Sequence, residues 1–276
     1  MILSHHNLKQ HTFSLTMFAE FGIGHEIVTL NPDTIYPSDI KDIIHPIGSR
    51  VIFQTPIPRR AKNVIDQAFF EESKFPAYDI DRMGNHFHGL LYSTKSHNVA
   101  PTTADAVYTI LNWYNVSLVG KDVVVIGRSD MVGNAVAQVL MGKDATVTVC
   151  HSKTLNLADK LKRADIVITA AGVPNLVKAR DLKPGVAVID VSISFDENGK
   201  ICGDCVKPGI SEDSIDMITH RYTPVPNGVG PVTRALLIKN ALGMRGDVFD
   251  IRDGNGNLTG KTYRIIPINE ENCGNM

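Results

Sequence analysis

The sequence predicts an α/β protein in which a doubly wound parallel sheet is joined to a smaller α/β domain. From about Val123 onward, short runs of β-branched residues alternate with segments of helical periodicity, which is the order that a parallel sheet with crossover helices requires. Those runs are apolar on both faces, as in strands covered by helices on both sides. The length of 276 residues also allows two domains of ordinary size.

The amino-terminal third is less regular and is expected to form the smaller domain. A helix is predicted over 8–23, a strand over 50–54 and a second helix over 60–73. The charges of the second helix are interpreted as its solvent-exposed face. A further helix, predicted over 101–116, connects this third to the rest of the chain.

The strands of the larger domain are predicted from four apolar runs and are followed by one long helix. The runs span 123–127, 145–150, 164–172 and 185–193. Each precedes a turn or a helix-like segment, as in consecutive β-α units. The segment 232–244 is expected to be a helix that returns to the first domain.

These elements predict three regions of the chain. Residues 1–103, completed by the return helix 234–246, are expected to form one domain, and residues 104–233 are expected to form the doubly wound one. Residues 247–276 are an extension in which two alternating runs flank Asp-Gly-Asn-Gly-Asn. That composition is typical of a hairpin turn.

Composition and charge argue against nucleic-acid and membrane partners. The formal net charge is −1, so no global excess of positive charge points to nucleic acid or acidic lipid. No apolar run reaches the roughly 20 residues that span a bilayer, and the amino terminus lacks a signal-peptide pattern. Four cysteines are too sparse for a disulfide scaffold, which favours a cytoplasmic location.

The segment 123–140 has the pattern of a nucleotide-binding unit. It runs from a strand through a turn that contains Gly127, Ser129 and Gly133 into a helix. A helix amino terminus presents unpaired N–H groups and a positive dipole end to an anion, and glycine lets a pyrophosphate approach closely. The spacing differs from G-x-G-x-x-G, so a turn of purely structural origin stays an alternative.

Two side chains in this region favour NADP over NAD. Proteins specific for NAD place an acidic residue at the end of the next strand, beside the ribose 2′-hydroxyl. Here that place holds His151, Ser152 and Lys153. The Arg128 guanidinium and the Ser152 hydroxyl are suited to a 2′-phosphate, which a carboxylate would repel. The other interpretation is that Arg128 is a solvated surface residue.

Several blocks of sequence resemble one known family. They include "VVVIGRSDMVGNAV", "ADIVITAAGVPNL", "VIDVSISFDENGKICGD", "TPVPNGVGPVTRALLIKN", "VIFQTPIP" and "DIDRMGNHFHGLL". In order and spacing they resemble the methylenetetrahydrofolate dehydrogenase/methenyltetrahydrofolate cyclohydrolase family over about residues 18–240. The resemblance implies a Rossmann-like NADP domain, a smaller α/β catalytic domain, a folate-binding cleft between them and a homodimer. Relative to the family, the amino terminus is expected to be shorter.

The resemblance also implies residue roles. Positions that match the family's cofactor contacts are Gly127, Arg128, Ser129, Val132, Gly133, His151, Ser152 and Thr233. Asp81 matches the aspartate that binds the pterin ring, a task suited to an acceptor-only carboxylate, and Gln54 matches a glutamine of the catalytic centre. Positions in the loop that closes over the folate are Pro224, Pro226, Gly228 and Pro231.

The two family reactions make different demands on these residues. Hydride transfer between the one-carbon unit and nicotinamide needs chiefly alignment, whereas hydrolysis of methenyltetrahydrofolate needs a group that deprotonates water. The family uses the lysine of a Tyr-x-x-x-Lys helix, and its positions are occupied here by Ser14 and Gln10. Lys9 would be rotated by about 140° and displaced by about 7.5 Å on the same helix.

We therefore expect an NADP-dependent methylenetetrahydrofolate dehydrogenase whose cyclohydrolase activity is weak or absent. One alternative is a bifunctional enzyme in which Lys9 or a histidine replaces the base. Another is a binding protein without turnover, since the glycines usual in the family at two positions are Arg82 and Asn227 and its Pro-Cys-Thr-Pro segment reads Ala-Pro-Thr-Thr over 100–103.

Two further patterns are assigned to structure rather than to a site. Cys202 and Cys205 have C-x-x-C spacing, but they lack a second pair of the kind that zinc sites use. His86 and His88 are interpreted as polar or surface residues. No metal site is predicted.

Overall fold

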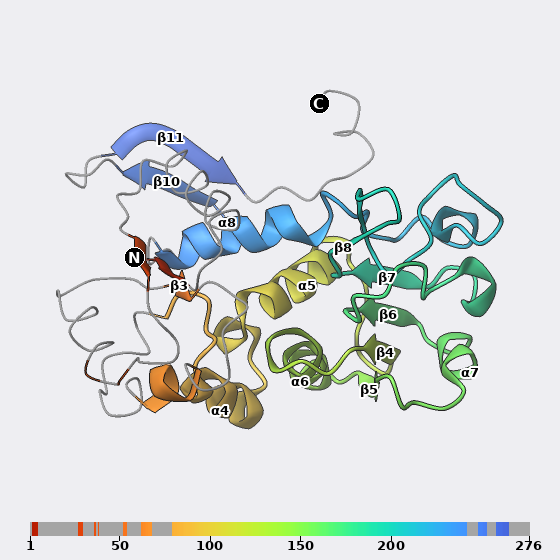
Figure 1. The fold of residues 1–276 in the computed structure, drawn as a ribbon, viewed down its shortest axis with the longest axis horizontal. Coiled ribbons are helices and arrows are strands. Elements are labelled where there is room, and N and C mark those ends of the chain that lie inside the picture. The colour runs from red at the N-terminus through yellow and green to blue at the C-terminus, as the bar shows by residue number, and fades with distance from the viewer. Residues whose placement is uncertain are drawn as a thin grey trace. The chain divides into compact units, whose positions relative to one another are not determined.

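The computed structural model describes residues 2–4, 27–29, 36, 38, 52–53, 62–67, 79–241, 248–252 and 258–264 (Figure 1). The chain divides into two compact units, one of Met1–Gly89 with Arg234–Met276 and one of Leu90–Thr233. The predicted helix over 8–23 lies outside the described residues. Within the described ranges, no helix is both long and apolar enough to cross a membrane.

The first unit contains a small parallel sheet. Its strands are β1 (Ile2–Ser4), β2 (Ile27–Thr29) and β3 (Ile52–Phe53), in the order β2-β1-β3. Ile2 is paired with Ile27 on one side and with Ile52 on the other. The predicted strand over 50–54 therefore contains β3.

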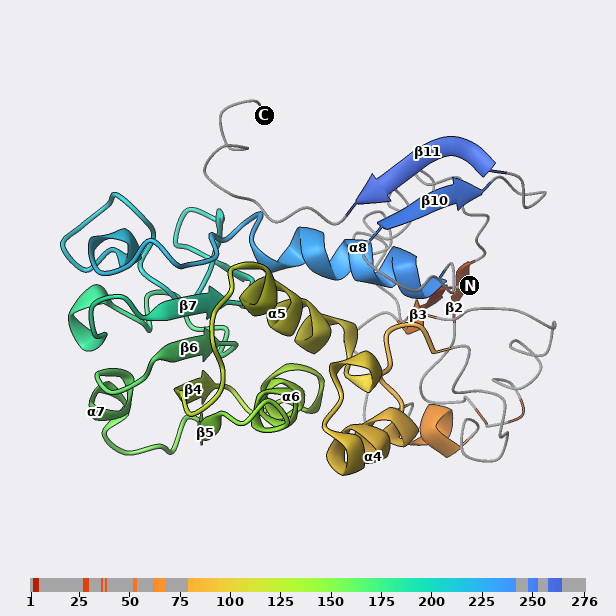
Figure 2. The same cartoon turned by 180° about the vertical axis from the view of Figure 1, so that it is seen from behind.

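Helices and a hairpin complete the description of this part of the chain. Residues 62–67 are helical, and α4 spans Asn85–Thr94. The long helix α8 spans Val229–Ala241. After it, β10 (Val248–Arg252) and β11 (Leu258–Arg264) pair antiparallel, with a register irregularity between Asp250 and Arg252. Figure 2 shows this pair from behind.

The second unit is built on a four-stranded parallel sheet. Its strands are β4 (Asp122–Ile126), β5 (Thr146–Cys150), β6 (Ile166–Thr169) and β7 (Ala187–Asp190), in the order β5-β4-β6-β7. The four predicted runs are thus strands of one sheet, and the predicted α/β fold with a parallel sheet is confirmed. The chain reverses its direction across the sheet between β4 and β6, so this pair is the topological switch point, beside which open α/β sheets bind ligands.

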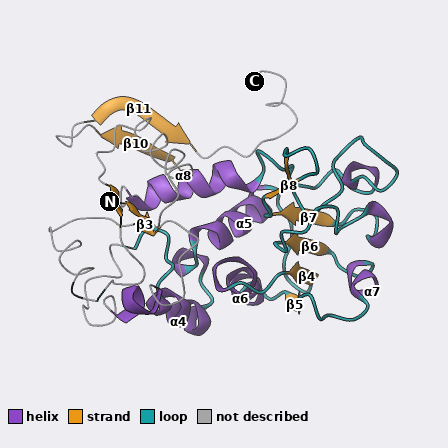
Figure 3. Cartoon of the chain, viewed as in Figure 1, coloured by secondary structure: helices purple, strands orange, loops and turns teal. Residues whose placement is uncertain are grey.

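Helices and short turns connect these strands (Figure 3). The first α-helix that lies wholly in the unit is α5 (Thr102–Trp113). The helix α6 (Ala135–Met141) connects β4 to β5, and α7 (Leu157–Leu161) connects β5 to β6. The two crossovers run in opposite directions, and right-handed crossovers then place their helices on opposite faces. Figures 1 and 2 show the strands between α6 and α7. The remaining elements are η2 (His97–Val99), η4 (Ala179–Asp181), β8 (Ser194–Phe195), β9 (Ile201–Cys202) and η5 (Ile215–Met217).

Both faces of the sheet are covered by apolar side chains. Val124 and Ile126 of β4 belong to a buried cluster that includes Leu161 of α7. Because side chains alternate along a strand, Val123 and Val125 face the other side, where they are also buried. All residues of β6 and β7 are buried. This explains why these two runs are apolar throughout rather than alternating with polar residues. The same prediction was wrong for β5, which lies at the edge of the sheet and in which only Cys150 is buried.

The last residues of the four strands form one row across the sheet. Ile126 is paired with Cys150 and with Thr169, and Thr169 is paired with Asp190. The loops that follow the strands therefore leave the sheet side by side at its carboxyl edge. All the predicted cofactor residues except Thr233 lie in the segments that follow two of these strands, β4 and β5.

Candidate functional site

The turn after β4 requires glycine at its first position. Gly127 has a φ of 119°, and a Cβ on it would lie 2.5 Å from the carbonyl oxygen of Ala170. Its backbone N–H donates to the carbonyl of Cys150 at 2.9 Å, and the Ala170 N–H donates to the carbonyl of Ile126 at 2.7 Å. The chain thus turns tightly against the backbone that follows β6, a position that only glycine fills without strain.

A π-helical turn, η3 (Asp130–Asn134), follows this glycine and leads into α6. It is closed by a 2.9 Å hydrogen bond from the Asn134 N–H to the Ser129 carbonyl. A Cβ on Gly133 would lie 2.2 Å from the Gly127 carbonyl oxygen, so the two predicted glycines pack backbone against backbone. The first N–H groups of a helix lack partners within it, and this turn brings them close to the end of β4.

The side chains predicted to select NADP lie in neighbouring loops. Arg128 follows Gly127, and Ser152 lies two residues beyond Cys150, which is paired with the last residue of β4. Both are exposed. The loop is held by hydrogen bonds from the His151 N–H to Thr154 Oγ1 at 2.8 Å and from the Lys153 N–H to His151 Nδ1 at 3.1 Å. The exposed side chains of Arg128 and Lys153 therefore offer two positive charges, and Ser152 a hydroxyl, to an anionic ligand at this edge.

The remaining predicted cofactor residues lie in two helical elements. Val132 is half-buried in η3, and Thr233 is half-buried in α8, where its hydroxyl donates to the carbonyl of Val229 at 3.2 Å. The predicted catalytic residue Gln54 lies outside the described residues.

The other predicted catalytic residue, Asp81, is half-buried in a tight turn of the first unit. The turn is closed by Asp79, whose Oδ2 accepts the Gly84 N–H at 2.8 Å and whose carbonyl accepts the Arg82 N–H at 3.3 Å. Asn240 of α8 fastens it by donating to the carbonyl of Ile80 at 2.9 Å.

Two departures from the family occur where the backbone is left-handed. Arg82 has a φ of 57° and Asn227 a φ of 76°, and the resemblance expects glycine at both. Asparagine adopts this conformation readily, whereas for most residues it costs roughly 1–2 kcal/mol. The Arg82 guanidinium donates to the side-chain oxygen of Asn240 at 2.9 Å, which offsets part of that cost. The turn geometry is therefore formed without the glycines.

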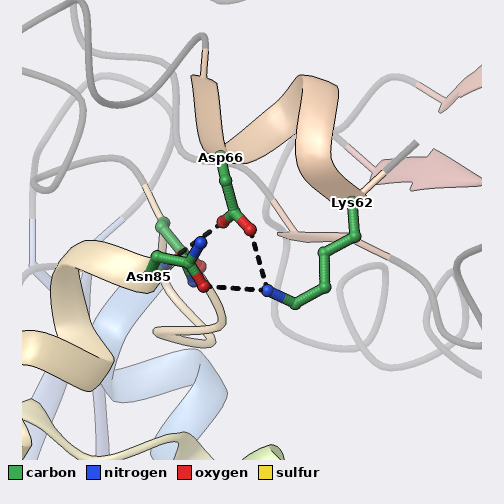
Figure 4. A network of polar contacts seen from close by, with 5 residues as sticks. Lys62, Asp66 and Asn85 are labelled. Atoms are coloured by element: carbon green, nitrogen blue, oxygen red, sulfur yellow. Dashed lines mark hydrogen bonds and ion pairs between the residues drawn. The ribbon is translucent and has the colours of Figure 1, made fainter. Parts of the chain in front are cut away.

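A polar network holds the start of the helix that follows this turn (Figure 4). Asp66 Oδ1 accepts the Asn85 N–H, the first of α4, at 3.1 Å. Lys62 donates to Asp66 Oδ2 at 2.8 Å and to the Asn85 side-chain oxygen at 3.1 Å. Asp66 thus acts as an amino-terminal cap supplied by another segment. It fixes where α4 begins, one residue after Gly84.

Burial changes the acidity of Asp79. Its side chain is buried, which raises the pKa to about 6, while hydrogen bonds from the backbone N–H groups of residues 81–84 oppose the shift. The folded protein therefore binds this proton more tightly than the unfolded chain, whose aspartate has a pKa near 3.8. The free energy of unfolding accordingly falls as the pH rises from about 4 to about 6.

The Asp79→Asn variant should remove this part of the pH dependence, because asparagine does not titrate. Two pKa units correspond to about 3 kcal/mol, so the variant should gain up to about that amount on the wild type between pH 4 and pH 7. Urea unfolding of both proteins at these two pH values measures the difference. A parallel pH dependence of the two proteins would contradict the assignment.

The loop predicted to close over the folate follows the edge of β7. Tyr222 forms a parallel bridge with Val188, and the Thr223 N–H donates to the Val188 carbonyl at 3.0 Å. Thr223 Oγ1 accepts the Asp190 N–H at 2.8 Å, and the Val225-Pro226 peptide is cis. Gly228 is buried, and a Cβ there would lie 2.3 Å from the Pro224 carbonyl oxygen. The predicted positions Pro224, Pro226 and Pro231 are exposed.

The two cysteines of the C-x-x-C pair lie in the second unit and are described by the structure. Cys202 and Cys205 are free thiols, and the pKa of Cys205 is raised well above its usual value by burial and by the nearby Asp190. A raised pKa disfavours the reactive thiolate. In the part of the chain that the structure describes, no three His, Cys, Asp or Glu side chains are grouped to hold a metal ion.

Sequence reasoning did not identify Asp204, which is buried and accepts four hydrogen bonds beside the cofactor loop. Its donors come from separate segments, so no short motif marks it. The one available signal was that Asp204 ends the block "VIDVSISFDENGKICGD", which resembles the family but gave this aspartate no role.

Comparison with known proteins gives a consistent result. Residues 101–246 match the family model described as tetrahydrofolate dehydrogenase/cyclohydrolase, NAD(P)-binding domain. The bifunctional protein FolD of Streptococcus pneumoniae serotype 2 (strain D39) is 38% identical over 218 residues, which are 75% of this chain and 71% of that protein.

Solved structures that resemble this chain come from proteins of the same kind. The bifunctional enzyme FolD, methylenetetrahydrofolate dehydrogenase/cyclohydrolase, from Campylobacter jejuni superposes with a TM-score of 0.75 at 31% identity, over 88% of this chain and 85% of that chain. The Trypanosoma brucei methylenetetrahydrofolate dehydrogenase-cyclohydrolase, complexed with NADP cofactor and inhibitor, gives a TM-score of 0.71 at 31% identity, over 87% and 84%.

Proposed function

The chain belongs to the tetrahydrofolate dehydrogenase/cyclohydrolase family, and we propose that it oxidises methylenetetrahydrofolate to methenyltetrahydrofolate with NADP as the hydride acceptor. We further propose that it hydrolyses methenyltetrahydrofolate weakly or not at all. The observation that carries the first proposal is the glycine loop after β4, with Arg128 and Ser152 in adjoining loops.

The residues at this edge suit NADP. Gly127 and Gly133 pack backbone against backbone without side chains of their own, and we expect a pyrophosphate to reach the N–H groups at the start of η3. The segment 150–154 contains no carboxylate that would repel a 2′-phosphate, and the Arg128 fork and Ser152 hydroxyl supply donors for it. The cofactor, when bound, takes the hydride, and the protein supplies binding and orientation.

The folate half is proposed from Asp81, Gln54 and the loop 223–231. Asp81 would accept hydrogen bonds from the ring N–H groups of the pterin. The turn described above holds its backbone between Asp79 and Gly84. Such a site aligns the one-carbon unit with the nicotinamide, and alignment is the chief requirement of hydride transfer.

The proposed loss of the hydrolase reaction rests on Ser14 and Gln10, which occupy the family's lysine and tyrosine positions. Water attack on methenyltetrahydrofolate requires proton removal. A serine hydroxyl is not itself a base at neutral pH, whereas hydride transfer needs chiefly alignment. The two activities should therefore separate in this chain.

Absorbance of the reduced nicotinamide, after mixing with methylenetetrahydrofolate and either NADP or NAD, tests the dehydrogenase. We expect a signal that is much stronger with NADP. Tight NADP binding without any reduction would instead favour a binding protein.

We also propose that the protein is a cytoplasmic homodimer, as the resemblance to the family implies. Sedimentation analysis should then give twice the mass of one chain.

The Arg128→Ala variant tests the cofactor preference. Loss of hydrogen bonds between a guanidinium and a phosphate costs about 2 kcal/mol, which is about a 30-fold rise in the Kd for NADP. The Kd for NAD should change by less than about threefold, because NAD lacks the 2′-phosphate. Arg180→Ala removes a surface arginine that is paired with Asp213 at 3.0 Å and serves as the control. Equal weakening of both cofactors by Arg128→Ala would contradict the assignment.

A further inference from the structure

A buried carboxylate ties together the segments that follow β6 and β7. Asp204 is fully buried, and its Oδ2 accepts hydrogen bonds from Thr169 Oγ1 at 2.5 Å and from Ser192 Oγ at 2.6 Å. Two backbone donors complete the set, the Ala171 N–H to Oδ2 at 2.8 Å and the Val173 N–H to Oδ1 at 2.7 Å. Both carboxylate oxygens are thus engaged by donors from separate loops.

The loop held by Asp204 is exposed, yet three successive backbone N–H groups in it donate hydrogen bonds to buried side chains. Residues 171–175 are exposed, while the Gly172 N–H donates to Ser192 Oγ at 3.3 Å between the two bonds to Asp204. A surface loop with its amides fixed in this way has little freedom to rearrange. Such order is what a preorganised binding surface requires.

This loop is also the surface against which the cofactor loop packs. Ala170 lies between two residues that donate to Asp204, Thr169 and Ala171. It is the residue that Gly127 approaches, with 2.5 Å between the Ala170 carbonyl oxygen and the place of a Gly127 Cβ. A shift of the backbone at 170 would therefore displace Gly127. Because β4 and β6 form the switch point of the sheet, both loops border the place where a ligand binds in this fold.

A second buried carboxylate holds Asp204 in place. Asp190, the last residue of β7, accepts the Cys205 N–H at 2.8 Å and the Ser192 N–H at 3.1 Å. Gly203, which precedes Asp204 in the chain, packs closely against Asp190, since a Cβ on Gly203 would lie 2.2 Å from Asp190 Oδ2. The segment 203–205 is thus clamped against the end of β7, and the position of Asp204 is determined by the sheet.

We propose that Asp204 is a positioning residue for NADP binding, acting through the loop 170–173 on Gly127 and the cofactor loop. The inference rests on the proposed function, because it assumes that the loop after β4 binds the cofactor. It adds that the affinity for NADP depends on a carboxylate that does not touch the cofactor.

The Asp204→Asn variant tests the inference. Asparagine keeps one acceptor oxygen but places an NH2 group where the other oxygen accepted an N–H, so at least one of the backbone donors loses its partner. We expect the Kd for NADP, measured by calorimetry, to rise about tenfold or more. The amides of Ala171 and Val173 should exchange with deuterium faster than in the wild type, and the KM for methylenetetrahydrofolate at saturating NADP should stay within about twofold.

The control is Asp196→Asn, because Asp196 also accepts two backbone N–H groups, from Asn198 and Lys200 at 2.9 Å each, in the turn between β8 and β9. Its Kd for NADP should stay within about twofold of the wild type. An unchanged NADP affinity in folded Asp204→Asn protein would overturn the inference. Absence of NADP binding by the wild type would instead overturn the proposed function.

A second variant decides the question if Asp204→Asn does not fold. Ser192→Ala removes one hydroxyl donor to Asp204 and the acceptor of the Gly172 N–H but leaves the carboxylate in place. Its Kd for NADP should rise about threefold, since one of several hydrogen bonds to the loop is lost. An unchanged Kd in this folded variant would contradict the positioning role.

Discussion

Replacement of Gly133 by alanine is expected to weaken NADP binding at least 100-fold, a loss of about 3 kcal/mol. The new Cβ would lie 2.2 Å from the Gly127 carbonyl oxygen and 2.9 Å from the Arg128 backbone nitrogen. No rotamer change relieves these contacts, because all the atoms involved belong to the backbone. The turn must open, and that moves the N–H groups of η3 away from the place of the pyrophosphate.

The same substitution should also lower the free energy of unfolding, by about 1–3 kcal/mol, as overpacking of a closed interior does. Gly89→Ala is the matched control, since a Cβ on Gly89 meets nothing within 4 Å and the residue lies within α4. That variant should be as stable as the wild type or more stable by up to about 1 kcal/mol. Calorimetric titration with NADP and thermal unfolding of both variants measure the effects. NADP binding by Gly133→Ala at wild-type affinity would refute the assigned pyrophosphate site.

The Asp81→Asn variant is expected to lower kcat/KM for methylenetetrahydrofolate about 1000-fold, which corresponds to about 4 kcal/mol. An amide of the same shape presents an NH2 group to the N–H donors of the pterin ring, so one favourable contact becomes a repulsive one. The substituted residue remains in the turn closed by Asp79 and Gly84. The Kd for NADP should therefore stay within about twofold.

Asp144→Asn provides the comparison for this variant. Asp144 is exposed in a left-handed turn with a φ of 63°, a conformation that asparagine also adopts readily. Its steady-state kinetics should match those of the wild type. A wild-type kcat/KM for Asp81→Asn would show that another residue binds the pterin.

The parallel sheet could be predicted because β4, β6 and β7 are buried on both faces and read as continuous apolar runs. The glycine loop could be predicted because a close backbone approach requires glycine at positions 127 and 133, and glycine at such positions is visible in the sequence. The π-helical turn at 130–134 was not predicted, since the sequence shows only a helix that begins after a glycine.

Other features depend on contacts between distant segments. Asp204 collects donors from residues 169–192, which lie 12–35 positions away, and no local spacing shows that they meet. Arg82 takes up a left-handed conformation that its residue type does not favour, aided by Asn240 at a distance of 158 residues. The raised pKa of Asp79 likewise follows from burial, which the sequence around it does not indicate.

The central claim, a dehydrogenase without the hydrolase reaction, is tested most directly by following both products of one reaction. After methylenetetrahydrofolate and NADP are mixed with the protein, timed samples are separated by chromatography, and NADPH and methenyltetrahydrofolate are quantified in each, because their absorbance bands overlap. We expect the two to accumulate in equal amounts at early times, because the methenyl product is released and not hydrolysed by the protein. Rapid formation of NADPH with methenyltetrahydrofolate held near zero would contradict the account and show that the chain carries a working base despite Ser14.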